Sequence, residues 1–384
     1  MNHALHLAVV GALAAGACVD QLPPITGTQA LRVDLVTPAD PGSTDTRLPD
    51  TARDTIIKVT AIDEKGEVDT TVSRDVDVYV QFLGTLTPVH EKGIPLTTIP
   101  LVAGVSANAP VALPPVFGAT EIWVEDTNGD SASYAVGASV PLWFRDPTIS
   151  DFQKPENEMA LDALERSPLQ NKQIAVSQSR YGANGRMIVT GVYAQGYTLS
   201  DVNCADASGT PPCVAGDYDH GFIFTFSRPK DQHGDALDVG KRITRFTGAV
   251  SEFNGLTEIG FPQTFAADDA PVAAQAPAPH VADQTWFTNK IQFERNEAGL
   301  IEVDGATVCP LDADYTTYKQ WKLDLGAGCG KAINVITAGV VEFDPAAYVG
   351  MALPKVIGTL RPINIGTFNV WIMYPRFAAD VVTP

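Results

Sequence analysis

The sequence predicts a mainly β protein made of more than one domain, and three observations lead to this prediction. The chain has 384 residues, enough for two or three domains that each bury a core of their own. Its 32 glycines and 28 prolines favour many short strands joined by turns over long helices. Apolar residues recur at every second position in many short runs, which is the spacing of half-buried strands.

The N-terminus predicts export. Residues 4–17 form an apolar run that is too short to span a bilayer but suits the core of a signal peptide. The run ends in Ala15-Gly16-Ala17-Cys18, which resembles the lipobox of bacterial lipoproteins. This resemblance implies that residues 1–18 are a signal peptide with an anchor cysteine, and that Cys18 carries the lipid. The same small residues also fit ordinary signal peptidase cleavage, which would release the chain with Cys18 free.

A short tether, residues 19–28, leads to a region of β signals at residues 29–146. Pro114 and Pro115 cannot donate to a ladder, so the segment that begins at Val111 is predicted to be an edge strand. About seven short strands in such a length are typical of an immunoglobulin-like sandwich, and the region resembles the Ig-like domains of bacterial surface proteins. The expected strands are residues 31–36, 56–62, 76–82, 111–115, 121–125 and 133–137.

The turn at residues 126–130 has two readings. Asp126, Asn128 and Asp130 are weak candidates for Ca²⁺ ligands, because their oxygen atoms are spaced along one loop. An Asn-Gly hairpin turn explains the same residues through backbone geometry alone, and we favour it.

Residues 147–265 predict a barrel preceded by one helix at residues 156–166. The expected strands cover residues 187–192, 196–201, 221–226, 237–243 and 247–259, separated by glycine turns. The order of these runs, and the stretch from Ile149 to Phe261, resemble the small OB barrel of secreted bacterial nucleases.

Two groups of side chains in this barrel bear on its ligands. Phe222, Phe224 and Phe226 alternate along one run, and we expect them to fill the barrel core. OB barrels bind single strands through aromatic residues and a basic groove, so Lys241, Arg242 and Arg245 form a possible ligand face.

The rest of the chain again contains short runs that are typical of β-strands. An Ala/Pro-rich linker or long crossing segment covers residues 266–284. Residues 285–384 then predict a second OB-like domain, although one larger barrel with excursions remains the alternative. Its expected strands lie at residues 299–309, 318–323, 332–336, 355–360 and 369–376.

The five cysteines support an oxidising compartment. Without Cys18, an even four remain, and local pairing of Cys204 with Cys213 and of Cys309 with Cys329 is the simplest of three connectivities. A four-cysteine metal site is the rival reading, but the closely spaced pairs of zinc sites are absent from the sequence.

The sequence contains no P-loop, nucleophile elbow, HExxH motif or dinucleotide fingerprint. We therefore assign no catalytic residue and no cofactor, and Asp217, Asp219 and His220 are interpreted as an acidic surface loop. The net charge of −19 makes nucleic acid an unfavourable partner. The predicted function is a lipid-anchored, non-catalytic binding or structural protein of the bacterial cell envelope, with a protein or glycan partner. The alternative is a single-stranded nucleic-acid-binding or nuclease-accessory protein.

Overall fold

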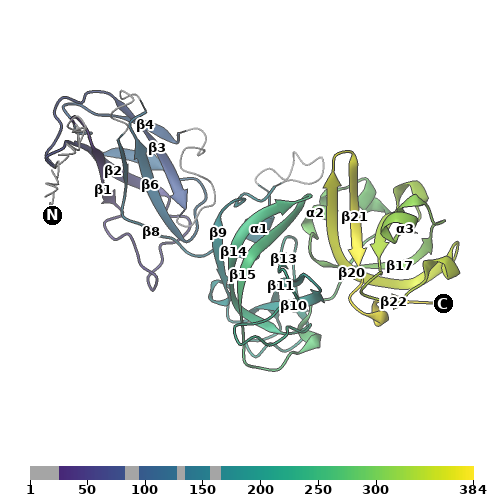
Figure 1. The fold of residues 1–384 in the computed structure, drawn as a ribbon. Coiled ribbons are helices and arrows are strands. Elements are labelled where there is room, and N and C mark those ends of the chain that lie inside the picture. Colours follow the sequence, from purple (N-terminus) through teal and green to yellow (C-terminus); the bar gives the residue numbers. More distant parts are fainter. Residues whose placement is uncertain (1–25, 83–94, 128–134, 156–165) are drawn as a thin grey trace, which may run out of the picture.

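The protein consists of a β-sandwich followed by two β-barrels (Figure 1). The structure is a computed structural model that describes residues 26–82, 95–127, 135–155 and 166–384. The chain is mainly β, as the sequence predicts. The sandwich lies at the N-terminal end of the molecule and the second barrel at the C-terminal end, with the first barrel between them.

Two antiparallel sheets form the sandwich. One has the strand order β1-β2-β5, so β5 is an edge strand, as the prolines beside it predict. The other has the order β4-β3-β6-β7, and β8 pairs with β6. The strands are β1 (Ala30–Thr37), β2 (Asp54–Ile62), β3 (Asp75–Phe82), β4 (Thr97–Pro100), β5 (Ala109–Ala112), β6 (Ala119–Glu125), β7 (Val136–Ala138) and β8 (Leu142–Trp143).

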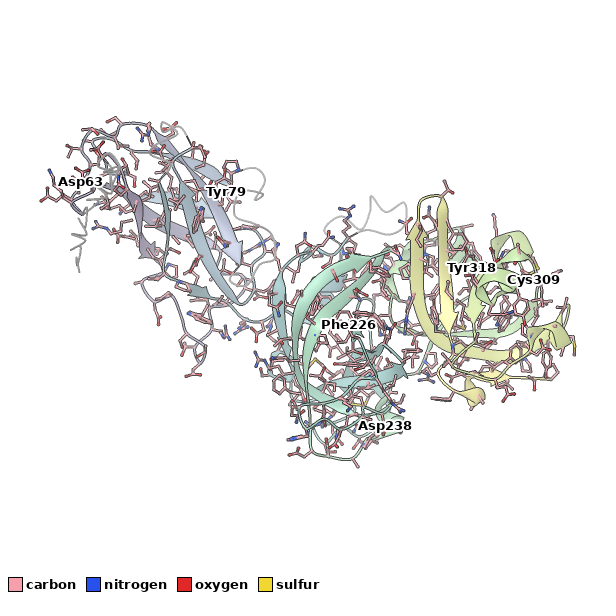
Figure 2. All side chains as sticks on the ribbon, in the orientation of Figure 1. Asp63, Tyr79, Phe226, Asp238, Cys309 and Tyr318 are labelled. Carbon is pink, nitrogen blue, oxygen red and sulfur yellow. A yellow bond between two sulfur atoms is a disulfide. The ribbon has the colours of Figure 1, made fainter. Side chains whose placement is uncertain are left out.

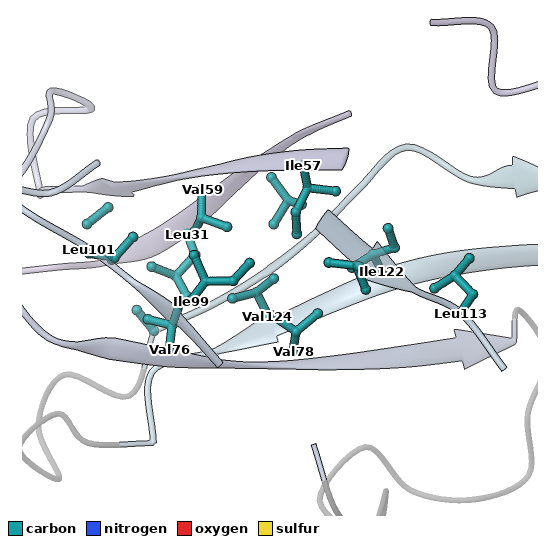
Figure 3. Close-up of a cluster of buried hydrophobic side chains, with 14 of the residues drawn as sticks. Leu31, Ile57, Val59, Val76, Val78, Ile99, Leu101, Leu113, Ile122 and Val124 are labelled. Carbon is teal, nitrogen blue, oxygen red and sulfur yellow. The ribbon is translucent and has the colours of Figure 1, made fainter. Parts of the chain in front are cut away.

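The sandwich core lies between the two sheets (Figure 3). Val59 of the first sheet and Val78 and Val124 of the second are fully buried. Along β6, the buried Ile122 and Val124 alternate with the half-buried Glu121 and Trp123, so this sheet presents one apolar face to the other. Burial of these faces is the main driving force that holds the sheets together.

Five strands close the first barrel. The order is β10-β11-β13-β15-β14, and β14 pairs back onto β10. Every pairing in the ring is antiparallel except β13 with β15, which is the arrangement of an OB-type barrel. The ring strands are β10 (Gly185–Tyr193), β11 (Gly196–Cys204), β13 (His220–Phe224), β14 (Arg242–Phe253) and β15 (Leu256–Ala266), while β9 (Gln173–Ser177) and β12 (Cys213–Val214) extend the sheet.

The second barrel repeats this topology. Its order is β17-β18-β19-β21-β20, closed by β20 on β17, and β19 with β21 is the parallel pair. The alternative of one larger barrel is therefore wrong. The ring strands are β17 (Leu300–Val308), β18 (Gln320–Asp324), β19 (Ile333–Ile336), β20 (Ala352–Ile365) and β21 (Phe368–Tyr374), with β16 (His280–Val281) and β22 (Val381–Val382) at the edges.

The helices of the described residues are short. Thr148 caps α1 and forms a capping box with Asp151. Phe152 of α1 packs into the core of the first barrel. The helix expected at residues 156–166 falls on residues that, apart from Arg166, lie outside the described ranges. The α-helices are α1 (Ile149–Gln153), α2 (Ile291–Arg295) and α3 (Ala313–Tyr318), and 3-10 helices cover Gln178–Arg180, Ala273–Gln275, Gln284–Phe287, Cys329–Lys331, Pro345–Tyr348 and Ala378–Asp380.

The Ala/Pro-rich segment at residues 266–284 runs along the first barrel and enters the second. The backbone N–H of Val272 donates to the carbonyl of Gly240 at 3.0 Å. The Gln275 amide donates to the carbonyl of Gly209 at 2.7 Å. The segment then forms β16, which pairs with β17. These contacts fix its path between the barrels.

Two disulfides stabilise loops of the barrels. Cys204 bonds to Cys213 and Cys309 bonds to Cys329, which confirms the local pairing and excludes a four-cysteine metal site. In the described part of the chain, no helix is long and apolar enough to cross a membrane.

Candidate ligand-binding face

The outer face of β11 and β13 in the first barrel is buried. Tyr197 of β11 and Ile223 of β13 point into the barrel core. The side chains that alternate with them along each strand therefore point outward. The outward Thr198, His220 and Phe222 are nevertheless buried. OB-type barrels bind their ligands on the face of the second and third strands, and in this barrel those strands are β11 and β13. The second barrel covers this face, so no ligand can reach it.

Close contacts hold the second barrel on this face. A Cβ atom at Gly299 would lie only 2.5 Å from the His220 ring, so the two backbones can approach only with glycine there. The His220 Nδ1 atom shares a hydrogen bond of 2.8 Å with the Ser200 hydroxyl. Burial lowers the pKa of His220 to about 3, and the ring is therefore neutral at physiological pH.

An aromatic cage around Arg361 forms the centre of the joint. Its guanidinium lies 4.1 Å from the ring centroid of Tyr193, 4.3 Å from that of Phe222 and 4.8 Å from that of Tyr374. Tyr193 and Phe222 come from the first barrel, so the cation joins aromatic residues of both barrels. Cation–π contacts of this kind are strongest where water is excluded.

The expectation that the alternating phenylalanines fill the first barrel is wrong. Ile223 occupies the core, and the alternation therefore turns Phe222 and Phe224 outward. Phe226, which Figure 2 labels on this barrel, is 68% exposed and contacts Phe224 with ring centroids 5.2 Å apart. Aliphatic residues, Tyr197, Phe246 of β14 and Phe152 of α1 fill the interior instead.

Buried glutamates strengthen the joint. Glu297 accepts a hydrogen bond of 2.8 Å from the backbone N–H of Thr257, which links the two barrels. Burial, and then the neighbouring charges of Glu294 and Glu252, raise the pKa of Glu297 well above its usual value. A neutral carboxylic acid is much less costly to bury than a carboxylate, so the raised pKa reduces the cost of burying this glutamate.

The corresponding face of the second barrel is partly open: Gln320 and Asn334 on it are buried, but Lys322 is not. Its second and third strands are β18 and β19, and a cavity of about 690 Å³ lies over them. This volume falls within the range of ligand pockets, roughly 300–1,000 Å³. The cavity is lined by aromatic residues, amides and lysines, chiefly Phe287, Phe293, Phe368, Trp371, Asn334, Asn364, Asn369, Lys290, Lys322 and Lys331. A neighbouring cavity of about 240 Å³ shares Phe287 and Lys331 with it.

Stacked rings form the apolar wall of this cavity. Trp371 stacks on Phe293 with the ring centroids 5.6 Å apart and an angle of 18° between the planes. Phe287 lies 5.6 Å from Phe293 in a tilted arrangement, and Trp286 supports Phe293 edge-on. Because each ring packs on another ring, the wall is rigid before any ligand arrives.

Amide groups supply polar contacts. The Asn334 carbonyl oxygen accepts a hydrogen bond of 2.9 Å from the Gln320 amide, and the Asn334 amide donates to the carbonyl of Trp371. These bonds fix the Asn334 side chain in the cavity floor. Asn364 and Asn369 are exposed on the β20–β21 hairpin, where they can exchange hydrogen bonds with a ligand.

The three lysines differ in charge balance. Lys322 forms ion pairs with Asp312 at 2.5 Å and with Asp314 at 3.1 Å. Burial acts to lower the pKa of Lys322, but the hydrogen bonds with these aspartates outweigh it and raise the pKa. Lys290 and Lys331 are exposed, and neither forms an ion pair within the described ranges. The free positive charge of the cavity therefore lies at these two lysines.

The basic residues singled out in the sequence do not form this site. The Lys241 ammonium donates to the carbonyl of Asp269, and Arg242 pairs with the carboxylate of the same residue at 3.1 Å. Arg245 lies over the Phe265 ring and lines a separate cavity that also involves Trp143 of the sandwich. The structure thus does not bring the three cations together on one free face.

Of the weak metal candidates, the structure describes Asp126 alone. Asp126 is fully buried and bonded through both carboxylate oxygens to Arg74, while Asn128 and Asp130 lie outside the described residues. Asp217 pairs with Arg295 at 3.4 Å. Among the residues that the structure describes, no group of three metal-ligating side chains comes together.

Comparison of the chain with family models, with curated proteins and with solved structures finds no match. The candidate site therefore rests on the geometry of this chain alone. Sequence reasoning missed this cavity, because its walls come from segments far apart in the chain. The pair Asn364 and Asn369, which flanks the turn at Gly366, was the one local signal of a polar hairpin beside aromatic residues.

Proposed function

We propose that this chain is an exported, lipid-anchored and non-catalytic binding protein of the cell envelope, in which the second barrel receives the ligand. One observation carries the proposal: the ligand face of the first barrel is buried against the second barrel, whereas the same face of the second barrel is partly open and carries a cavity. The sandwich and the first barrel then act as a spacer between the anchor and the receptor barrel.

Other features support this role. Two disulfides favour an oxidising compartment outside the cytoplasm. The lipobox-like sequence at Cys18 supplies a site for two acyl chains, which give stable membrane residence. The candidate face combines a rigid aromatic wall with few convergent polar groups, which is the composition of a binding pocket.

The binding part of the proposal is tested with Phe368→Ala. Phe368 lines the cavity at the β20–β21 hairpin, so its removal is expected to weaken binding of the full chain to an isolated envelope fraction by about tenfold. Phe226→Ala removes an exposed phenylalanine from the first barrel and serves as the matched control. Equal binding by both variants, or loss only in the control, would contradict the proposal.

The anchoring part is tested by mass spectrometry of the mature N-terminus. A diacylglycerol-modified Cys18 is the expected result. An unmodified Cys18 would mean that the protein is released by ordinary signal peptidase cleavage instead.

A further inference from the structure

The lining of the open cavity narrows the chemistry of its ligand. Ring faces are provided by Phe287, Phe368 and Trp371, none of which is fully buried. Such faces pack against flat apolar surfaces, including the C–H face of a pyranose ring. Exposed amides at Asn364 and Asn369 offer both donors and acceptors, which match neighbouring hydroxyl groups.

The charges of the cavity favour a ligand that carries carboxylates. Lys290 lies on the segment before β17, and Lys331 lies on the turn between β18 and β19, so both belong to the cavity wall. Lys322 is already balanced by Asp312 and Asp314. A ligand that leaves both free lysines unpaired gains nothing from them, whereas one with a carboxylate or similar group forms charge-assisted hydrogen bonds.

Single-stranded nucleic acid fits this charge pattern less well. Such strands are bound in grooves whose positive charge follows the backbone over several nucleotides. Here two free lysines stand beside two aspartates, in a chain with a net charge of −19. The free positive charge is therefore confined to two points and does not follow a phosphate backbone over several nucleotides.

We infer that the open cavity of the second barrel binds an acidic glycan, a segment of uronic acid rings of which one or two carboxylates pair with Lys290 and Lys331. This inference rests on the proposed function and adds the ligand class. The sugar rings lie on Trp371 and Phe368, and Asn364 and Asn369 bind their hydroxyls. The smaller cavity shares Phe287 and Lys331 with the main one, so the two together offer room for more than one ring.

Calorimetric titration of the full chain tests the inference with three probes: a galacturonic acid hexamer, the same hexamer methyl-esterified, and a dT12 oligonucleotide. We expect the acidic hexamer to bind at least tenfold more tightly than either other probe. Lys290→Gln with Lys331→Gln is expected to weaken it by about tenfold or more and to leave the weak binding of the ester unchanged. Lys65→Gln with Lys230→Gln makes the same change of net charge at exposed positions outside the cavity and should have little effect.

The outcomes separate the inference from the proposed function. Equal binding of acid and ester that Phe368→Ala abolishes would overturn the acidic ligand and retain the receptor role of the second barrel. Tighter binding of dT12, with a steep loss in salt, would overturn it in favour of a nucleic-acid ligand. No binding of the acidic hexamer would also overturn it. Binding that Phe368→Ala leaves intact would overturn both the inference and the proposed function.

Discussion

Substitution of Gly299 by alanine tests the contact between the second barrel and His220 on the ligand face of the first barrel. The backbone of Gly299 is not in the left-handed region, so alanine is compatible with its conformation. The added Cβ would, however, lie 2.5 Å from Cδ2 and 2.8 Å from Cγ of His220. The ring is fully buried and bonded to Ser200, so it cannot move without losing that hydrogen bond.

The expected loss follows from three contributions. Overpacking of a buried site costs about 1–3 kcal/mol. A broken buried hydrogen bond adds about 1–3 kcal/mol. Alanine lowers the conformational entropy of the unfolded chain, which offsets about 0.4–1 kcal/mol of this loss of stability. We therefore expect Gly299→Ala to lower the free energy of unfolding by roughly 1–5.5 kcal/mol, measured by urea denaturation of the full chain.

A control and a double-mutant cycle make the test specific. A Cβ added at Gly182 would meet no atom within 4 Å, and this glycine has no positive φ, so Gly182→Ala should change stability by less than about 0.5 kcal/mol. In a His220→Ala background, Gly299→Ala should cost about 1 kcal/mol or less, because the ring that it meets is gone. Equal losses for Gly182→Ala and Gly299→Ala, or simple additivity in the cycle, would refute this account of the joint.

Three further predictions concern pH, the disulfide and metal. Burial, and then the charge of Asp219, raise the pKa of Asp201 to about 8. The contribution of the protonated Asp201 carboxyl to the free energy of unfolding is therefore complete below about pH 3.8 and is lost as pH rises through 8. At 1.36 kcal/mol per pH unit, Asp201→Asn should reduce the loss of stability between pH 5 and 8 by up to about 4 kcal/mol in urea titrations, and an unchanged pH slope would contradict this. Replacement of Cys309 and Cys329 by alanine should lower stability by about 3 kcal/mol and weaken glycan binding, since Cys329 lies in the cavity wall; unchanged affinity would argue against a rigid rim. EDTA should leave the melting temperature unchanged while Asp126→Asn lowers it, because Arg74 rather than a metal ion balances this carboxylate; a shift with EDTA would restore the calcium reading.

The strand pattern could be predicted because alternation of apolar residues is local. The strand expected at residues 299–309 is observed as Leu300–Val308, and the run at 196–201 as Gly196–Cys204. Alternation indicates which residues share a face but not which face is inside. Ile223 and the adjacent Phe222 illustrate this limit, since the larger phenylalanine lies at the joint and the isoleucine in the core.

The site could not be predicted for a related reason. The cavity wall combines Phe287, Lys331 and Phe368, which come from three segments separated by long stretches of chain. Barrel closure brings these segments together, and the register of that closure is a tertiary property. The burial of the ligand face of the first barrel likewise depends on docking of the second barrel. The periodicity of apolar residues in the sequence does not indicate which domains dock.

Hydrogen–deuterium exchange of the full chain with and without the galacturonic acid hexamer tests the central claim most directly. The account predicts slower exchange in residues 284–293, 329–334 and 364–371, which form the cavity wall, and unchanged exchange in β11 and β13 of the first barrel. Protection that appears in the sandwich or first barrel, with none around the cavity, would contradict the claim that the open face of the second barrel binds the ligand.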